Sequence, residues 1–353
     1  MRSCVALGVL AATSAAMGQS GMGIKDITWR LGAPFPELRK GCSLGVFEGK
    51  AISAGGMRHP WCESTTTYQY DAHADKWIAL PSLPRGRVYM DGVWLPDAFY
   101  VVGGRREGRT LTELTRLSRT GGRLGWVELK PMSDDRGWAA MDVWRTRIIV
   151  AGGNSLRKGQ PAFNEKSTCR AVEILDTVRP EAGWSKLPDI PGHSRGWVAG
   201  AIVGDAFYLF GGLHFTIVDG KRQNHRLRET LRLDLKTRKW ARRADLPYAL
   251  SGHDAVSYQD RYVILVGGAP DWSADQDKAY GRVPNEYANR VLVYDAQRDA
   301  YQMLPSPMPH GTNDIRVTRI GQTLYALGGE NVEKATSNTT NFLRVGTIVT
   351  SSE

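Results

Sequence analysis

The chain has 353 residues, of which 42% are hydrophobic and 23% are charged, as in ordinary folded globular proteins. A chain of this length can hold two domains, although one large all-β domain also fits, and its 39 glycines indicate frequent tight turns. The formal net charge of +10 would suit a nucleic-acid partner, but the lysines and arginines are scattered along the chain. We therefore expect a generally basic surface and no nucleic-acid binding.

The first 18 residues predict an export signal. They combine one arginine, an apolar stretch over residues 5–17 and small residues just before position 19. The stretch is too short to span a bilayer, and no later segment holds 18 uninterrupted apolar residues, so we expect no membrane span. The sequence thus predicts an exported protein, periplasmic or secreted, in which residues 19–28 lead into the folded domain.

Six short apolar runs that end in a double glycine follow along the chain. They read "AISAGG" from position 51, "FYVVGG" from 99, "IIVAGG" from 148, "FYLFGG" from 207, "VILVGG" from 263 and "LYALGG" from 324. Their first glycines are 48 to 61 residues apart. Each run predicts a strand that ends at a turn, and a period near 50 residues is typical of propeller blades that are four-stranded sheets.

An aromatic residue before a proline-containing loop ends each of the first five repeats: Trp77, Trp126, Trp184, Trp240 and Tyr301. The sixth repeat stops at "NFLRVGTIVTSSE" without this part, whereas the N-terminal "DITWRLGAPFPEL" carries Trp29 and a proline-rich loop but no double glycine. We therefore predict that the N-terminal strand completes the last blade. Such closure removes exposed sheet edges.

Over residues 29–348 the chain resembles the kelch-repeat propellers, the group that includes the galactose oxidase catalytic domain. The resemblance implies an all-β fold, namely a six-bladed kelch β-propeller whose last blade is closed by the N-terminal strand, with residues 349–353 as a C-terminal tail. It indicates the fold and leaves the function open, because such propellers include enzymes, receptors and scaffold-binding modules.

Two registers upstream of the double glycines carry candidate ligand-binding residues. Sixteen residues before each first glycine stand Arg39, Arg87, Arg136, Arg195, Ser251 and Thr312. Fourteen residues before it stand Gly41, Tyr89, Trp138, Trp197, His253 and Asp314. The resemblance implies that this stretch leads into the innermost strand of each blade, so that the equivalent positions gather in one central funnel.

Arginines in such a funnel offer forked donors to a carboxylate or phosphate, and aromatic rings stack on sugar rings or cations. The residues that we expect to bind the ligand are Arg39, Arg87, Tyr89, Arg136, Trp138, Arg195, Trp197 and Asp314. The alternative is a structural role, in which glycine permits a tight turn, tryptophan packs between blades and arginine binds a neighbouring carbonyl group. The variation in the second register favours a pocket, because a packing role would be uniform.

Glu330 and His253 are the candidate catalytic residues. Glu330 directly follows the last double glycine, and His253 stands in the inner register. A structural, hydrogen-bonded role for His253 is the alternative. Cys42 and Cys62 flank the first double glycine, and we predict that they form a disulfide, leaving Cys169 free. Because the cysteines lack Cys-x-x-Cys spacing, we expect no structural metal.

Among exported kelch propellers the sequence is most similar to the N-acetylneuraminate epimerases. That resemblance implies an acid and a base at the anomeric hydroxyl and ring oxygen of a sugar, an arginine clamp for its carboxylate, and no cofactor. Leu213 follows the double glycine of the fourth repeat, where that family is expected to carry glutamate. The expected partner is an acidic carbohydrate or another small anionic ligand.

Two other functions stay open. One is a non-catalytic propeller that binds a glycan or a protein partner on the same loop-bearing face. The other is a copper radical oxidase, because Cys42 and Tyr89 stand near equivalent inner positions, as the galactose oxidase resemblance requires. However, Gly252 precedes His253 where a tyrosine is expected, and Asp314 stands where a second histidine is expected.

Overall fold

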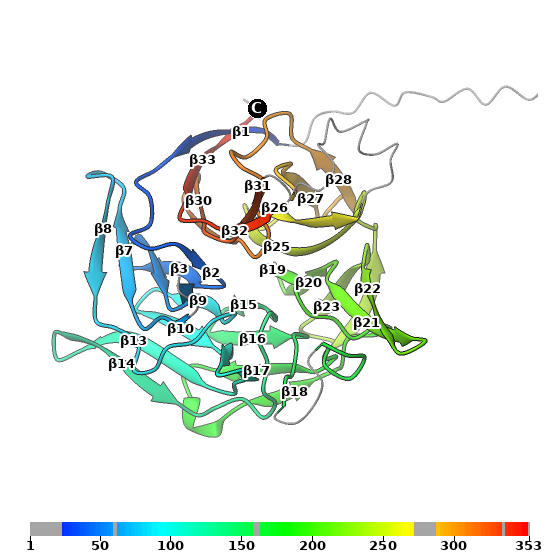
Figure 1. Ribbon diagram of the computed structural model, residues 1–353, viewed down its shortest axis with the longest axis horizontal. Coiled ribbons are helices and arrows are strands. Elements are labelled where there is room, and N and C mark those ends of the chain that lie inside the picture. The colour runs from blue at the N-terminus through cyan, green and yellow to red at the C-terminus, as the bar shows by residue number, and fades with distance from the viewer. Residues whose placement is uncertain (1–22, 59–61, 158–162, 272–286, 334–335, 352–353) are drawn as a thin grey trace, which may run out of the picture.

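The computed structural model describes residues 23–58, 62–157, 163–271, 287–333 and 336–351. Its strands form six four-stranded antiparallel sheets, and Figure 1 shows these sheets arranged as the blades of a ring around a central axis. The predicted all-β, six-bladed propeller is therefore confirmed. The predicted signal peptide, residues 1–18, lies outside the described residues.

The first three blades follow one another along the chain. Blade one consists of β3 (Ser43–Phe47), β4 (Lys50–Ala54), β7 (Thr67–Asp71) and β8 (Lys76–Leu80). Blade two consists of β9 (Asp91–Leu95), β10 (Ala98–Val102), β13 (Leu114–Thr120) and β14 (Arg123–Leu129). Blade three consists of β15 (Ala140–Trp144), β16 (Arg147–Ala151), β17 (Val172–Asp176) and β18 (Ser185–Leu187).

The last three blades complete the ring. Blade four consists of β19 (Ala199–Val203), β20 (Ala206–Phe210), β23 (Thr230–Asp234) and β24 (Lys239–Arg243). Blade five consists of β25 (Ala249–Tyr258), β26 (Tyr262–Asp271), β27 (Leu292–Asp295) and β28 (Ala300–Met303). Blade six consists of β29 (Arg316–Ile320), β30 (Thr323–Leu327), β33 (Leu343–Thr350) and β1 (Ile24–Leu31).

Blade six is completed by the N-terminus, as the displaced Trp29 segment predicts. Strand β1 pairs antiparallel with β33, so that Trp29 lies opposite Gly346, and Figure 1 shows the two strands side by side. Ile24 and Ile27 of β1 are buried in the core between blades five and six. The chain therefore closes its own ring.

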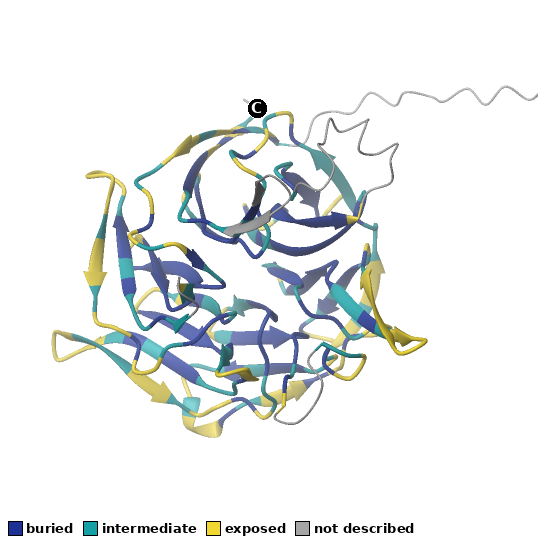
Figure 2. Cartoon of the chain, in the orientation of Figure 1, coloured by how far each residue is buried: buried dark blue, intermediate teal, exposed yellow. Residues whose placement is uncertain are grey.

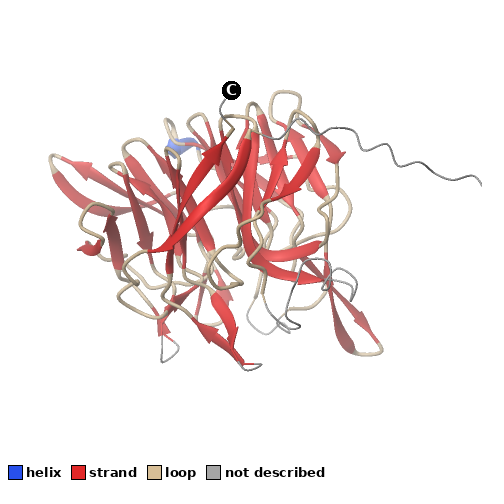
Figure 3. Cartoon of the chain, turned by 90° about the horizontal axis from the view of Figure 1, so that it is seen from above, coloured by secondary structure: helices blue, strands red, loops and turns tan. Residues whose placement is uncertain are grey.

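Short hairpins follow several of the double glycines, and we call the side that carries them the loop face. They are β5 (Met57–Arg58) with β6 (Cys62–Glu63) and β2 (Arg39–Lys40), β11 (Arg105–Arg106) with β12 (Arg109–Thr110), β21 (Leu213–Val218) with β22 (Lys221–Arg226), and β31 (Glu330–Glu333) with β32 (Thr336–Thr339). In Figure 3 they lie on the side opposite the C-terminus, which we call the turn face. The described part of the chain contains one 3₁₀ helix, η1 (Pro180–Ala182), and no helix there is long and apolar enough to cross a membrane.

The double glycines permit adjacent blades to approach each other closely. Gly103 has a φ of 59°, and a Cβ atom at this position would lie 2.3 Å from the carbonyl oxygen of Arg136 in the next blade. The amide of Gly104 donates to that same oxygen at 2.9 Å. A residue with a side chain would be strained here and would also clash, which explains why the sequence repeats glycine at these positions.

The core lies between the blades. Each of six buried clusters joins two neighbouring blades, for example Phe47 and Ile52 of blade one with Phe99 and Leu117 of blade two. Figure 2 shows that the inner strands are buried and that outer strands such as β8 and β14 are largely exposed. This packing holds the first strand of every blade rigidly at the axis.

Candidate functional site

Six residues meet around the axis, five from the loops that lead into the first strand of their blade and one, in blade five, from the beginning of β25. All six have left-handed backbone angles, with φ between 48° and 68°. We call them the axial ring: Gly41, Tyr89, Trp138, Trp197, Gly252 and Asp314. Backbone hydrogen bonds join neighbouring members, since the amide of Tyr89 donates to Gly41 at 2.7 Å and that of Asp314 donates to Gly252 at 2.9 Å. Equivalent residues of the six blades therefore converge on the axis.

His253 is not the blade-five member of this ring, which corrects the count of fourteen residues. In blade five the turn between Tyr258 and Tyr262 holds three residues, whereas the matching turn in blade four, between Val203 and Ala206, holds two. The additional residue shifts the count by one position. Gly252 therefore occupies the ring, and His253 lies one residue further inside the blade.

The four arginines of the first register do not line a funnel, which corrects a second prediction. The side chains of Arg39, Arg87, Arg136 and Arg195 are all buried. Three of them donate through Nη1 to the carbonyl oxygen of the first glycine of their own blade. These bonds join Arg87 to Gly103 at 3.3 Å, Arg136 to Gly152 at 3.4 Å and Arg195 to Gly211 at 3.1 Å. Their role is to hold the glycine turn in place.

Each of these arginines also has a carboxylate partner. The nitrogen-to-oxygen distances are 2.5 Å from Arg39 to Glu37, 3.5 Å from Arg87 to Glu113, 2.5 Å from Arg136 to Glu173 and 3.0 Å from Arg195 to Glu229. In blade six this role belongs to Arg344 of β33. It donates to the carbonyl oxygen of Gly328, the first glycine of that blade, at 3.5 Å and to the hydroxyl of Thr312 at 2.5 Å. Because the guanidinium groups bind carbonyl and carboxylate groups of the protein itself, these arginines have the structural role that was the alternative to ligand binding.

The aromatic residues of the ring do gather on the loop face. The rings of Tyr89 and Trp138 stack with centroids 4.1 Å apart, and those of Trp138 and Trp197 are 4.8 Å apart. Phe163 lies 5.3 Å from Trp197, and Phe215 of β21 lies 6.0 Å from Trp197. We call these five residues the aromatic rim. Sequence reasoning missed Phe163 and Phe215 because the loops that carry them share no register.

Two carboxyl groups lie beside the rim. Asp314 belongs to the axial ring, and its neighbour Asn313 exchanges two backbone hydrogen bonds of 2.8 Å with Glu330. Burial and the charge of Glu330 raise the pKa of Asp314 to about 7. The ammonium group of Lys40 forms an ion pair with Glu330. The site thus holds one carboxyl group with a raised pKa and one that is paired with a cation.

His253 lies just beneath the ring, at a cavity of about 10 Å³ available to the centre of a water molecule. Trp138, Trp197, Asp314 and Arg316 also line this cavity. The His253 side chain is 2% exposed, and burial lowers its pKa to about 3. A neutral, enclosed imidazole of this kind is a poor proton acceptor, so the structure does not support the predicted catalytic role.

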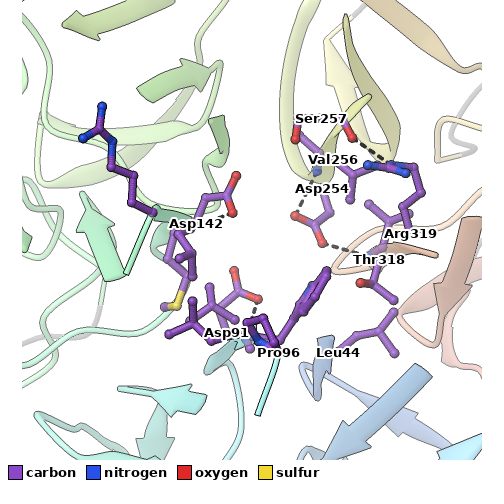
Figure 4. Close-up of a pocket in the computed structure, with 18 residues that line it drawn as sticks. Leu44, Asp91, Pro96, Asp142, Asp254, Val256, Ser257, Thr318 and Arg319 are labelled. Atoms are coloured by element: carbon purple, nitrogen blue, oxygen red, sulfur yellow. Dashed lines mark hydrogen bonds between the residues drawn. The ribbon is translucent and has the colours of Figure 1, made fainter. Parts of the chain in front are cut away.

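A larger cavity of about 320 Å³ lies at the turn-face end of the axis. Figure 4 shows the carboxyl groups of Asp91, Asp142 and Asp254 facing it from blades two, three and five. Burial raises the pKa of Asp142 to about 6 and that of Asp254 to about 7. Sequence reasoning missed these residues, although an aspartate inside an apolar inner strand, as in "YMDGVW", "AMDVW" and "GHDAV", is a visible signal.

The carboxyl groups at this cavity connect the inner strands. Asp142 accepts from the amide of Ile202 in the next blade at 2.6 Å, and Asp254 accepts from that of Val317 at 2.8 Å. Arg316 of blade six reaches across the axis, where its Nε lies 3.4 Å from Asp91 of blade two. Among the described residues no three His, Cys, Asp or Glu side chains are placed to hold a metal ion.

The structure contains no disulfide between Cys42 and Cys62, which corrects that prediction. All three cysteines in the described part of the chain are free. Cys42 is buried in the core cluster between blades six and one, whereas Cys62 lies on β6, where its sulfur accepts from Arg58 Nε at 3.0 Å. The two side chains therefore belong to different layers of the molecule.

Comparisons with known proteins support the fold at low identity, and no family model matches the chain. The chain is 26% identical to "Kelch-like protein terF" of Aspergillus terreus over 254 residues, 68% of this chain and 52% of that protein. It is 22% identical to "Kelch-like protein 36" of Bos taurus over 280 residues, 77% of this chain and 41% of that protein. It is 27% identical to "N-acetylneuraminate epimerase" of Yersinia pestis over 181 residues, 44% of this chain and 45% of that protein.

The matched regions cover about half or less of these curated relatives. Similarity at this identity and coverage supports the repeat fold, and it carries no information on the ligand.

Proposed function

This chain is a kelch-repeat propeller distantly homologous to kelch-like proteins and N-acetylneuraminate epimerases, and from that premise we propose that it binds an acidic sugar on its loop face and interconverts the anomers. The observation that carries the proposal is the position of Asp314 and Glu330 beside the aromatic rim. Aromatic faces stack on the apolar faces of sugar rings, and two carboxyl groups of different ionisation supply an acid and a base.

In this proposal Asp314 is the acid and Glu330 is the base. Glu330 accepts the proton of the anomeric hydroxyl, protonated Asp314 gives its proton to the ring oxygen, and the bond between that oxygen and the anomeric carbon breaks. Rotation and the reverse proton transfers close the ring as the other anomer. Because burial raises the pKa of Asp314 to about 7, a substantial fraction of this group carries the required proton at neutral pH.

Arg105 is the residue that we assign to the carboxylate of the sugar. It pairs through its backbone with Val88, directly before Tyr89 of the rim. Its guanidinium group forms no ion pair within 4 Å among the described residues, in contrast to the four arginines of the register. A partly exposed arginine with unused donors beside an aromatic rim suits a carboxylate.

The test is the rate at which freshly dissolved α-N-acetylneuraminate converts to the β anomer, followed by proton NMR. The protein is expected to accelerate the conversion over buffer, and Asp314→Asn or Glu330→Gln to lower the protein-catalysed rate about 100-fold or more. Asp219→Asn, in the exposed turn between β21 and β22, is the matched control and should leave the rate unchanged. A wild-type rate equal to that of buffer would overturn the catalytic proposal.

A binding propeller without catalysis is the second candidate, and the Lys40–Glu330 ion pair favours it. The Lys40 ammonium group already occupies the Glu330 carboxylate, and this contact would have to break before Glu330 could take a proton from the sugar. In that case titration calorimetry would detect N-acetylneuraminate binding that Trp197→Ala or Arg105→Ala weakens, while the rate of anomer conversion would stay at the buffer value.

A further inference from the structure

Two buried side chains at the axis have polar atoms without a hydrogen-bond partner. Both ring nitrogens of His253 and Nε1 of Trp138 find no acceptor or donor among the described residues. Their side chains are almost fully enclosed, with His253 2% exposed and Trp138 4% exposed. Buried polar groups normally have partners, so unmet hydrogen-bonding capacity at one cavity indicates a missing occupant.

The polar side chains of Asp314 and Arg316 also line the cavity, but neither hydrogen-bonds to His253 or to Trp138 Nε1. Ala139, Val198 and Gly252 form part of its wall and contribute no polar side-chain atom. The positions equivalent to His253 in the other blades are Cys42, Met90, Ala139, Val198 and Ile315, as the strand registers show. His253 is thus the one histidine in a layer that otherwise packs as core, and packing does not explain it.

The chemistry of the two side chains defines the occupant. A neutral imidazole presents one donor and one acceptor, and the indole of Trp138 presents one donor. A carboxylate only accepts, so it could not pair with the unprotonated ring nitrogen, and an ammonium group only donates, so it could not pair with the indole N–H. A hydroxyl group both donates and accepts, so it can pair with the indole N–H and the unprotonated ring nitrogen at once. The cavity volume of about 10 Å³ also fits a single water-sized group.

We propose that this axial cavity is a subsite for one hydroxyl group of the bound sugar, in which the Trp138 indole donates a hydrogen bond to the hydroxyl oxygen and the hydroxyl donates a hydrogen bond to a ring nitrogen of His253. The inference rests on the proposed loop-face site, of which the cavity would be the floor, because Trp138, Trp197 and Asp314 line both. His253 then determines which sugar fits.

The test uses N-acetylneuraminate and its monodeoxy derivatives, each lacking one hydroxyl group, in titrations against the full chain. One derivative is expected to bind wild-type protein at least about 10-fold more weakly than the parent sugar. The His253→Leu variant should bind the parent sugar more weakly than the wild type does, by the same factor. It should bind that derivative as well as the wild type does. His253→Gln, which keeps one donor and one acceptor, should recover part of the affinity.

Ile315→Val is the matched control, because Ile315 occupies the same layer in blade six and does not line the cavity. It should bind all the sugars as the wild type does. The subsite would be overturned if the wild type bound every monodeoxy derivative equally well, or if His253→Leu still bound the derivative more weakly than the parent sugar by the full wild-type factor. Either result would leave the loop-face proposal intact. Failure of wild-type protein to bind the parent sugar would overturn both.

Discussion

Arg136 and Glu173 form a buried ion pair within blade three. Their Nη2 and Oε2 atoms are 2.5 Å apart, and the two side chains are 1% and 0% exposed. The other carboxylate oxygen accepts from the amide of Ser133 at 3.0 Å. The pair therefore fixes the loop that leads into the blade to the third strand, β17, and holds Trp138 two residues further on in the axial ring.

Arg136→Met is expected to lower the free energy of unfolding by about 3–5 kcal/mol, because Glu173 would keep a buried charge without its partner. Adding Glu173→Met should recover part of the loss, since a buried pair replaced by apolar side chains is often tolerated. Arg195→Met should lower the free energy of unfolding by less than Arg136→Met does, because the partner of Arg195, Glu229, is partly exposed and can be solvated. Urea unfolding followed by tryptophan fluorescence measures all three, and a loss below about 1 kcal/mol for Arg136→Met would contradict the assigned role.

The same pair shows how far the repeat could be interpreted. Recurrence at a fixed distance from the double glycines correctly identified equivalent positions, because equivalent backbone turns need equivalent residues. The recurrence does not show in which direction a side chain points, and three of the four arginines point to the glycine carbonyl group of their own blade. Counting back from the double glycine also gave the wrong ring residue in blade five. The turn between Tyr258 and Tyr262 is one residue longer there, so every position before that turn is displaced by one, and His253 is counted in place of Gly252.

The closure of the ring is testable through Ile27, which is fully buried between blades five and six. Ile27→Ala should destabilise the protein by about 2–5 kcal/mol, through lost apolar burial and the cavity that remains. Val349→Ala on the paired strand β33 is the control, because Val349 is 39% exposed and should change stability by less than about 1 kcal/mol. Equal thermal unfolding midpoints for the two variants would show that β1 is not part of the core.

His253 is expected to make the protein less stable in acid. Its pKa is about 3 in the folded protein, because burial disfavours the imidazolium ion, and near 6.5 in the unfolded chain. The unfolded state therefore binds a proton first, and the stability contributed by neutral His253 is lost as the pH falls from about 6.5 toward 3. The loss amounts to about 1.4 kcal/mol per pH unit.

Comparison of wild type with His253→Leu isolates this effect. The difference in unfolding free energy should shift in favour of the variant by about 3 kcal/mol between pH 7 and pH 4.5. His73→Leu, at an exposed position, should follow the wild-type curve. Parallel stability curves for wild type and His253→Leu would show that His253 keeps an ordinary pKa in the folded protein.

The candidate site was only partly visible in the sequence for a related reason. Tyr89, Trp138, Trp197 and Asp314 were identified because they belong to the repeated lead-in, whose geometry the fold dictates. Phe163 reaches the rim from a long loop, and loops are the part of a repeat protein that the repeat does not constrain. Asp91, Asp142 and Asp254 lie in apolar inner strands, and the repeat does not distinguish a polar residue that faces the axis from one that packs in the core.

The three cysteines in the described part of the chain should differ in their reactivity toward a thiol-specific alkylating reagent. Cys62 is partly exposed on the loop face and should react first. Burial raises the pKa of both Cys169 and Cys42, which lowers the fraction of reactive thiolate. Cys42, enclosed in the core between blades six and one, should react only after unfolding. Mass spectrometry of the labelled native and denatured protein, without reductant, measures this order. Failure of Cys42 and Cys62 to be labelled even after denaturation would instead show that they are joined in a disulfide.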